Sequence, residues 1–187
     1  TVSIWDPDDN RLVARFEGFK EAVDALPFGD DIIVSEYETG RVLRFHPTSP
    51  GARTVIASGL EVPAGLAVYG DNLYVADRNG TLFQILDDGE RLDPPYPMAS
   101  GLAGPEGVTA DEDGALYVVE EDADRLIRVD PETGTVTLVA DGLALNGVEQ
   151  KSIEKATSVG FLAGVAIGSG SLYVSGYPDS RVYRIDP

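Results

Sequence analysis

The chain has 187 residues, with 32 aspartates and glutamates against 14 lysines and arginines, a net charge of −18, one histidine and no cysteine. The length allows one domain with a sizeable core, and the hydrophobic content of 43% is that of a globular protein. This composition excludes a disulfide scaffold, a cysteine nucleophile and a multi-histidine metal centre, and the negative charge disfavours nucleic acids and anionic membranes as partners.

Short apolar segments of two kinds alternate along the chain. Segments of the form x-h-x-x-h-x, where h is apolar, occur five times, at residues 1–6, 41–46, 81–86, 125–130 and 181–186. More continuous apolar segments occur four times, at residues 31–36, 72–77, 115–120 and 171–176. A glycine followed by a large apolar residue recurs in the same phase, with a spacing of about 42 residues, at Gly18, Gly59, Gly101 and Gly142.

Each period holds four such segments separated by Gly, Asp, Asn or Pro, and four strands in about 42 residues are typical of a β-propeller blade. We name the strands a to d from the central channel outward. The continuous segments are strand b, because neighbouring blades cover both of its faces, and the x-h-x-x-h-x segments are strand c. A β-sandwich, the alternative all-β fold, predicts no fixed period. The sequence therefore predicts an all-β propeller of about four four-stranded blades.

The whole chain, residues 1–187, reads as one propeller domain. Blade repeats are expected at about residues 20–60, 61–102, 103–143 and 144–187, and residues 1–19 supply strands c and d of a preceding or closing blade. The chain thus begins and ends on equivalent c strands, which leaves unpaired edges. We expect it to be part of a longer propeller, or to self-associate, rather than to form a closed four-bladed monomer. Trp5, in an apolar slot of strand c, is expected in the core.

The functional end of such a propeller is where strand a begins and strand b ends. Alignment on strand b predicts two channel-facing slots, one holding Val23, Ala64, Glu106 and Ala163, and the next holding Asp24, Gly65, Gly107 and Gly164. Acidic residues also end strand b in three periods, at Glu36, Asp77 and Glu120. Oxygen ligands converging on one concave mouth suit Ca²⁺, another divalent cation or a cationic ligand, whereas solvated surface charge is the plainer alternative.

Other residues near this mouth are further candidates. Tyr37 and Tyr177 follow strand b and are placed to stack on a ligand. An insertion at residues 144–161 contains a helix-like stretch, Val148–Thr157, in a d-to-a connection at the same end. Long loops at such a position narrow or cover a site in some proteins and are surface decoration in others.

The segments PAGLAVYGDNLYVADRNGTLFQI and GPEGVTADEDGALYVVEEDADRLIRVDPETG resemble the NHL-repeat and regucalcin/gluconolactonase-like superfamily of six-bladed propellers. Lactonases of that group hold a divalent cation at the channel mouth through Glu, Asn and Asp. The resemblance implies Glu106, which precedes Gly107, and Asn146, which precedes Gly147, as metal ligands. A clear second Asn and the Ser-Asp-Gly aspartate are absent, and so is the channel histidine of virginiamycin-lyase-like members.

Two functions follow from these features. The first is a propeller that binds a small ligand or a protein partner at its acidic mouth, with Glu36, Tyr37, Asp77 and Tyr177 as ligand-binding candidates. The alternative is a divalent-metal-dependent lactonase or esterase-like hydrolase, in which Glu106 and Asn146 hold the metal and Asp24 or Glu120 is the catalytic base. The chain begins at Thr1, which indicates processing or trimming, and an extracytoplasmic or secreted location is favoured.

The net charge predicts a response to salt. Uncompensated negative charges within one small domain repel each other, and added ions screen that repulsion. We expect the midpoint of thermal unfolding, followed by circular dichroism, to rise by a few degrees as moderate NaCl is added at neutral pH. A midpoint that falls or stays flat from low salt upward contradicts this.

Overall fold

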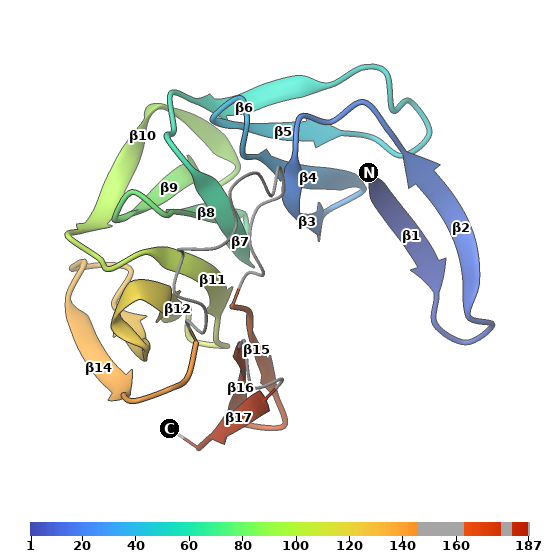
Figure 1. Cartoon of the computed structure of the whole chain (residues 1–187). Coiled ribbons are helices and arrows are strands. Elements are labelled where there is room, and N and C mark those ends of the chain that lie inside the picture. The colour runs from blue at the N-terminus through green and yellow to red at the C-terminus, as the bar shows by residue number, and fades with distance from the viewer. Residues whose placement is uncertain (146–162, 177–180, 187) are drawn as a thin grey trace, which may run out of the picture.

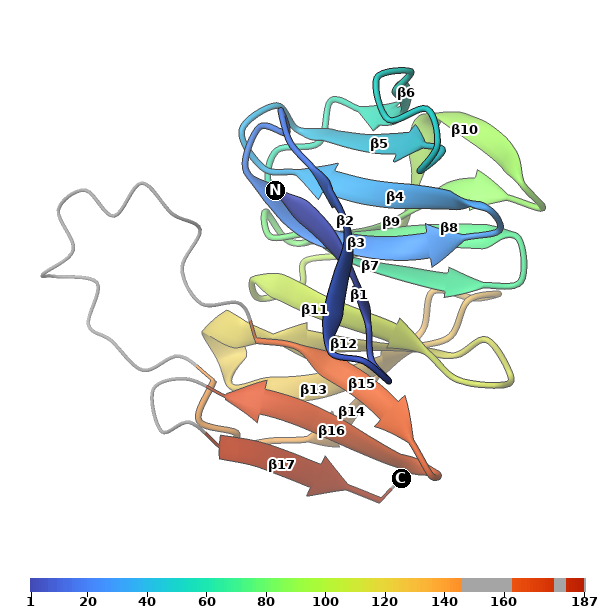
Figure 2. The ribbon, with the colours of Figure 1, turned by 90° about the vertical axis from the view of Figure 1, so that its right-hand side faces the viewer.

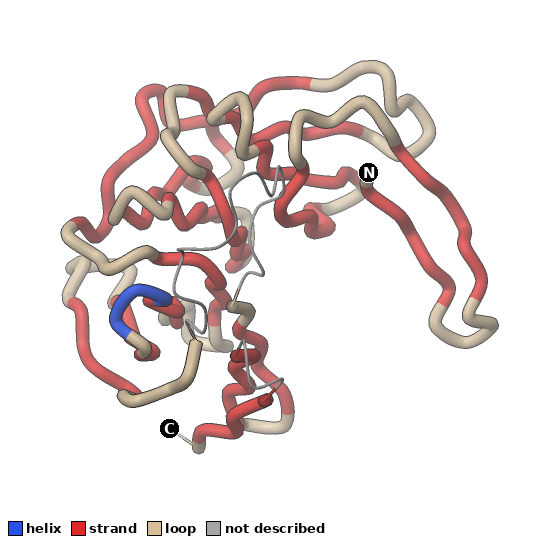
Figure 3. Tube along the Cα trace, viewed as in Figure 1, coloured by secondary structure: helices blue, strands red, loops and turns tan. Residues whose placement is uncertain are grey.

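The computed structural model describes residues 1–145, 163–176 and 181–186. Within these residues the chain forms seventeen strands and one short 3₁₀ helix, η1 (Glu121–Ala123). Figure 3 shows the strands in red and the helix in blue. The strands make five antiparallel sheets arranged around an axis like the blades of a propeller (Figure 1). The predicted all-β propeller is therefore confirmed, and the described part of the chain holds no helix long and apolar enough to cross a membrane.

The sheets follow one another in chain order. A two-stranded hairpin comes first, followed by four blades in which consecutive strands pair. The hairpin is β1 (Val2–Asp6) and β2 (Arg11–Phe16); blade 1 is β3 (Ala22–Phe28), β4 (Asp31–Glu36), β5 (Arg41–Phe45) and β6 (Thr54–Ser58); blade 2 is β7 (Pro63–Tyr69), β8 (Asn72–Asp77), β9 (Thr81–Asp87) and β10 (Glu90–Ser100); blade 3 is β11 (Pro105–Ala110), β12 (Leu116–Glu120), β13 (Arg125–Val129) and β14 (Val136–Ala140); and blade 4 is β15 (Val165–Gly168), β16 (Ser171–Gly176) and β17 (Arg181–Ile185). The strands b and c expected from the sequence lie within two residues of these bounds.

Apolar contact between neighbouring sheets holds the propeller together. The second strands of blades 1 to 3, β4, β8 and β12, are buried along almost their whole length because a sheet lies against each face. One apolar cluster fills each gap. The clusters are centred on Phe45 between the hairpin and blade 1, on Val42 and Ile85 between blades 1 and 2, on Leu82 and Val129 between blades 2 and 3, and on Leu126 and Leu172 between blades 3 and 4.

Near the axis the first strands of the blades approach each other closely, and two glycines permit this. A Cβ on Gly65 would lie 2.3 Å from the carbonyl oxygen of Glu106, and a Cβ on Gly107 would lie 2.6 Å from that of Ala163. The Gly107 amide instead donates a hydrogen bond to the Ala163 carbonyl, with an N···O distance of 3.1 Å. Backbone-to-backbone contact therefore sets the width of the channel at this end.

The blades form an open arc. The β1–β2 hairpin stands at one end and blade 4 at the other, and blade 4 has three described strands (Figures 1 and 2). The expectation that Trp5 belongs to the core is wrong, because its side chain is 54% exposed. Among the described residues, no sheet lies against the outer face of β1. The helix expected at Val148–Thr157 lies outside the described residues.

The close approach at the axis predicts a cost for any side chain on Gly65. In Gly65→Ala, the new Cβ overlaps the Glu106 carbonyl, so we expect a loss of about 2–3 kcal/mol in the free energy of unfolding measured by urea denaturation. Gly51→Ala is the control, because open space surrounds Gly51 and a surface substitution changes stability by no more than about 0.5 kcal/mol. Equal effects of the two substitutions would show that the axis is not tightly packed.

Candidate functional site

A cavity of about 250 Å³ lies on the axis, at the end where the first strand of each blade begins. Its walls come from the first strands of all four blades and the residues just before them: Val23, Asp24, Gly65, Glu106, Gly107, Val108, Ala163, Gly164 and Val165. Seven of the eight residues that the sequence places in the two channel-facing slots line this cavity; Ala64 is the exception. The channel-facing register is thus confirmed for those seven.

Glu106 is the buried carboxyl group of this cavity. Its side chain is 1% exposed, and its Oε2 accepts a hydrogen bond from the Ala163 amide at 2.7 Å. Its Oε1 lies 2.9 Å from Nε of Arg78, which reaches over from the connection after β8. The terminal nitrogen of Arg78 also pairs with Glu121. One arginine therefore lies between two glutamates that belong to the next blade.

The contact between Arg78 and Glu106 is an ion pair without hydrogen-bond geometry. Nε of Arg78 is the one buried side-chain nitrogen or oxygen in the described part of the chain that has no hydrogen-bond partner. Burial raises the pKa of Glu106 to about 8, and the neighbouring Glu121 adds to that rise, while the Ala163 amide and Arg78 act in the opposite direction. A carboxyl that exchanges its proton near neutral pH therefore lines the cavity.

Asp24, the second acid on the cavity wall, connects two blades. Its Oδ2 accepts a hydrogen bond from the Leu66 amide of β7, and its Oδ1 accepts one from the Ala25 amide, both at 2.8 Å. The Leu66 contact joins the first strand of blade 1 to the first strand of blade 2. Both oxygens of this candidate base thus accept a hydrogen bond from the backbone.

The acids that end strand b have a common structural role. Glu36, Asp77 and Glu120 are each at most 2% exposed, and each accepts a hydrogen bond from the backbone that leads into the first strand of its own blade. The donors are the amide of Lys20 for Glu36, the amides of Glu61 and Val62 for Asp77, and the amide of Ala103 for Glu120, with N···O distances of 2.6–2.9 Å. These carboxylates hold the connection between consecutive blades in place.

Arginines neutralise two of the three strand-end acids. Arg41 donates to Glu36 at 2.9 Å, and Arg125 donates to Glu120. Burial by itself raises the pKa of Glu36, but hydrogen bonds from Lys20, Thr39 and Arg41 outweigh it and hold the pKa below its ordinary value. These acids thus stabilise the fold through their hydrogen bonds, and their role as ligand-binding or catalytic residues stays a prediction.

Blade 4 replaces the acid with a different contact. Gly176 ends its second strand, and a Cβ there would lie 2.4 Å from the Ala144 carbonyl oxygen. The Ala144 amide donates instead to the hydroxyl of Tyr183 on β17, at 2.9 Å. The acidic ring at this end therefore stops at blade 3.

The rim of this end is exposed and acidic. Tyr37 is 38% exposed beside the end of β4. Glu38, Glu61 and Asp122 are exposed in the same set of connections. The predicted ligands Asn146 and Tyr177 lie outside the described residues. Within the described ranges, no group of three or more His, Asp or Glu side chains is placed to hold a metal ion.

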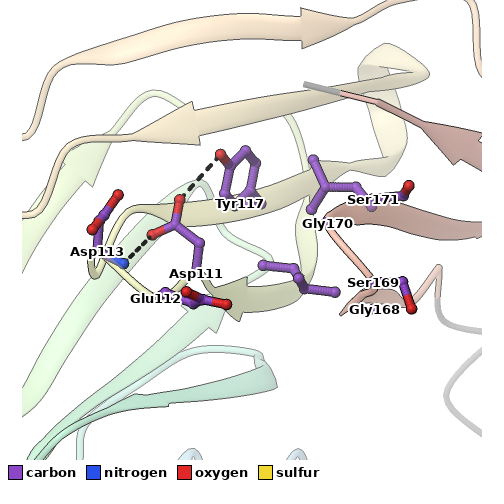
Figure 4. A pocket seen from close by; sticks show the side chains of 10 residues that line it. Asp111, Glu112, Asp113, Tyr117, Gly168, Ser169, Gly170 and Ser171 are labelled. Carbon is purple, nitrogen blue, oxygen red and sulfur yellow. Dashed lines mark hydrogen bonds between the residues drawn. The ribbon is translucent and has the colours of Figure 1, made fainter.

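A second cavity, of about 440 Å³, lies between blades 3 and 4 at the opposite end of the strands (Figure 4). The turn Asp111–Asp113, Tyr117 and the segment Ile167–Leu172 line it. The Asp111 carboxylate accepts hydrogen bonds from the Asp113 and Ala115 amides and from the Tyr117 hydroxyl. Burial, followed by the neighbouring Asp111, raises the pKa of Tyr117. The polar groups of this cavity stabilise its turn.

Known proteins match this chain in fold and not in sequence. No model of a known protein family matches it, and no curated protein does. A protein of unknown function from Bacteroides thetaiotaomicron superimposes with a TM-score of 0.67 at 19% identity, over 90% of this chain and 42% of that one. A gluconolactonase from Xanthomonas campestris gives 0.66 at 16%, over 90% and 59%. Virginiamycin B lyase from Staphylococcus aureus gives 0.58 at 14%, over 97% and 57%.

These matches confirm the resemblance to six-bladed propellers at the level of the fold. The chain spans about half the length of the propellers that it matches. Identities this low extend to the fold alone, because one fold supports many functions.

The sequence did not reveal the partners of Glu106. Arg78 follows β8 and Glu121 follows β12, so the three residues meet only because blades 2 and 3 pack side by side. The structural role of the strand-end acids did leave a signal, since Glu36 and Glu120 each precede an arginine by five positions, at Arg41 and Arg125. The repeated spacing indicates a glutamate that pairs with an arginine of the same blade.

The raised pKa of Glu106 predicts a pH effect on stability. The folded protein retains this proton up to about pH 8, whereas the unfolded chain releases it near the ordinary value of 4.5. The folded state therefore binds more protons in this window, and its stability falls as pH rises through it. We expect Glu106→Gln to remove on the order of 1–3 kcal/mol of that decline in the free energy of unfolding. Glu112→Gln, an exposed acid at the far end, is the control; identical pH slopes in both variants would contradict the assignment.

Proposed function

We propose that the protein is a binding module, which holds a small cationic ligand or a basic side chain of a protein partner at the Glu106 end of its channel. The observation that carries this proposal is how many hydrogen-bond donors the carboxylate oxygens at this end already have within the protein. Asp24 and Glu120, which hydrolysis needs as a free base, have protein donors on both carboxylate oxygens. Glu106 differs from them, because one of its oxygens has an ion-pair partner without a hydrogen bond.

Charge supports a cation as the ligand. The exposed Glu38, Glu61 and Asp122 belong to the rim, and the whole chain carries a net charge of −18. A concave site with acidic walls raises the local concentration of cations. The cavity of about 250 Å³ is slightly smaller than the usual range for drug-sized molecules, which favours a compact group such as an ammonium.

The metal-dependent hydrolase is the second candidate, and the position of Glu106 favours it. Glu106 lines the cavity at the start of β11 and precedes Gly107, as the resemblance to lactonases implies for a metal ligand. A gluconolactonase is also among the proteins that share this fold. Against it, no group of three or more His, Asp or Glu side chains in the described part of the chain is placed to hold a metal ion.

Binding measurements and an activity assay separate the two functions. Tetramethylammonium and Ca²⁺ are each titrated into the protein while backbone amide NMR signals are followed. The binding function predicts shifts at Gly65, Gly107 and Gly164 with tetramethylammonium, and affinity that increases as pH rises through about 8, where Glu106 ionises. Glu106→Gln is expected to weaken binding about tenfold, the effect of losing one contact with a charged group, and Glu112→Gln is expected to leave it unchanged.

Gluconolactone hydrolysis with and without a chelator completes the test. Turnover that the chelator abolishes would establish the hydrolase in place of a pure binding module. Absence of any channel shift with either cation would overturn the binding proposal itself.

A further inference from the structure

The third strand of each complete blade carries the x-h-x-x-h-x pattern, and the two apolar positions h of that pattern face opposite neighbours. The first faces the following sheet and the second faces the preceding one. Between blades 1 and 2, Val42 of β5 and Ile85 of β9 belong to one apolar cluster, and between blades 2 and 3, Leu82 of β9 and Val129 of β13 belong to another. All four side chains are fully buried, with 0% exposure. These two slots therefore report whether a sheet has a neighbour on a given side.

The same slots are exposed at the two ends of the arc. Trp5 occupies the second apolar position of the pattern in β1, on the side where a preceding sheet would lie, and it is 54% exposed. Val182 is the first apolar residue of β17, on the side where a following sheet would lie, and it is 68% exposed. On the inner side of the hairpin, Val2 is buried against blade 1. Each end of the arc thus presents an apolar face without a neighbour among the described residues.

The outer face of blade 4 repeats the interface of an inner blade. In blade 2, Ala67, Tyr74 and Leu82, one from each of its first three strands, pack against blade 3 and are at most 3% exposed. Their counterparts in blade 4 are Ala166, Tyr173 and Val182, and all three are exposed. An apolar face with this geometry is built to pack on another blade.

We propose that both faces are docking surfaces for one seven-stranded β-segment of the same blade type, with strand order d-a-b-c-d-a-b. Three observations set that order. Blade 4 has strands a, b and c and takes a strand d. The hairpin has strands c and d and takes strands a and b. The propellers that share this fold have six blades, which leaves room for one complete blade between them.

A second copy of this chain does not fit the two faces. Each copy brings seventeen described strands, and two such sets do not divide into four-stranded blades. A copy docked on blade 4 would also leave Trp5 of the first copy exposed. Repulsion between two chains of charge −18 adds to the mismatch.

The protein's own repeats provide the probe. Residues 48–120 contain β6 to β12, which run d-a-b-c-d-a-b. A copy of these residues is attached after Pro187, because Asp186-Pro187 and His46-Pro47 occupy the same place after strand c. The matched control carries residues 48–62, which supply the strand d of blade 4 and lack the complete blade that would cover Trp5. Trp5 is the sole tryptophan in the chain and in both extended proteins, so its fluorescence reports one of the two faces directly.

The seven-strand extension is expected to give a monomer by light scattering, with Trp5 emission shifted to shorter wavelength and protected from iodide quenching. The one-strand control is expected to leave Trp5 as accessible as in the original chain. Equal protection by both extensions would overturn the proposal, as would a dimer of the original chain with Trp5 already protected.

A second comparison tests the blade 4 face and does not depend on closure at the hairpin. In the original chain, Val182→Asp is expected to leave the thermal midpoint unchanged, whereas Leu82→Asp, the equivalent residue in blade 2, lowers it strongly. In the seven-strand extension, Val182→Asp is expected to lower the midpoint as well. A strong loss from Val182→Asp in the original chain would show that the face is already covered and would overturn the proposal.

Discussion

Burial of apolar surface between adjacent sheets is the interaction on which the rest of this structure depends. A four-stranded sheet with apolar residues on both faces cannot hide them alone, so each blade is stable only against its neighbours. This explains why β4, β8 and β12 are buried almost throughout, and why glycines let the first strands of blades 2 to 4 come into backbone contact. It also explains the two apolar faces at the ends of the arc, where the same residue pattern continues without a neighbouring sheet in the described residues.

The acidic end of the channel depends on this packing. Glu36, Asp77 and Glu120 hold the backbone that leads into the first strands of blades 1 to 3, which places those strands at the axis. The blades so positioned bring Arg78 of one blade between Glu106 and Glu121 of the next. Of the acids that looked alike in the sequence, the strand-end ones are structural groups, and Glu106 lies buried on the cavity wall with a raised pKa.

The period of the sequence was enough to predict the blade, because strand b is apolar on both faces and strand c has a fixed pattern. The channel-facing register followed from the same alignment, as Gly65 and Gly107 show. The prediction that Trp5 is buried was wrong, because the equivalent position in blades 1 to 3 is buried by the preceding sheet. The Arg78–Glu106 pair also could not be predicted, since residues 28 positions apart on different blades meet only through tertiary packing.

The most direct test of the dependence on neighbours is native-state hydrogen exchange of the 187-residue chain. Blades 2 and 3 have a sheet on both sides, so the amides of β8, β12 and β13 should exchange most slowly, near the rate set by global unfolding. The hairpin β1–β2 and blade 4 have one neighbour each in the described arc and should exchange much faster. Equal protection of β1, β17 and β8 would contradict the account, because it would mean that the terminal sheets are held by something other than one adjacent blade.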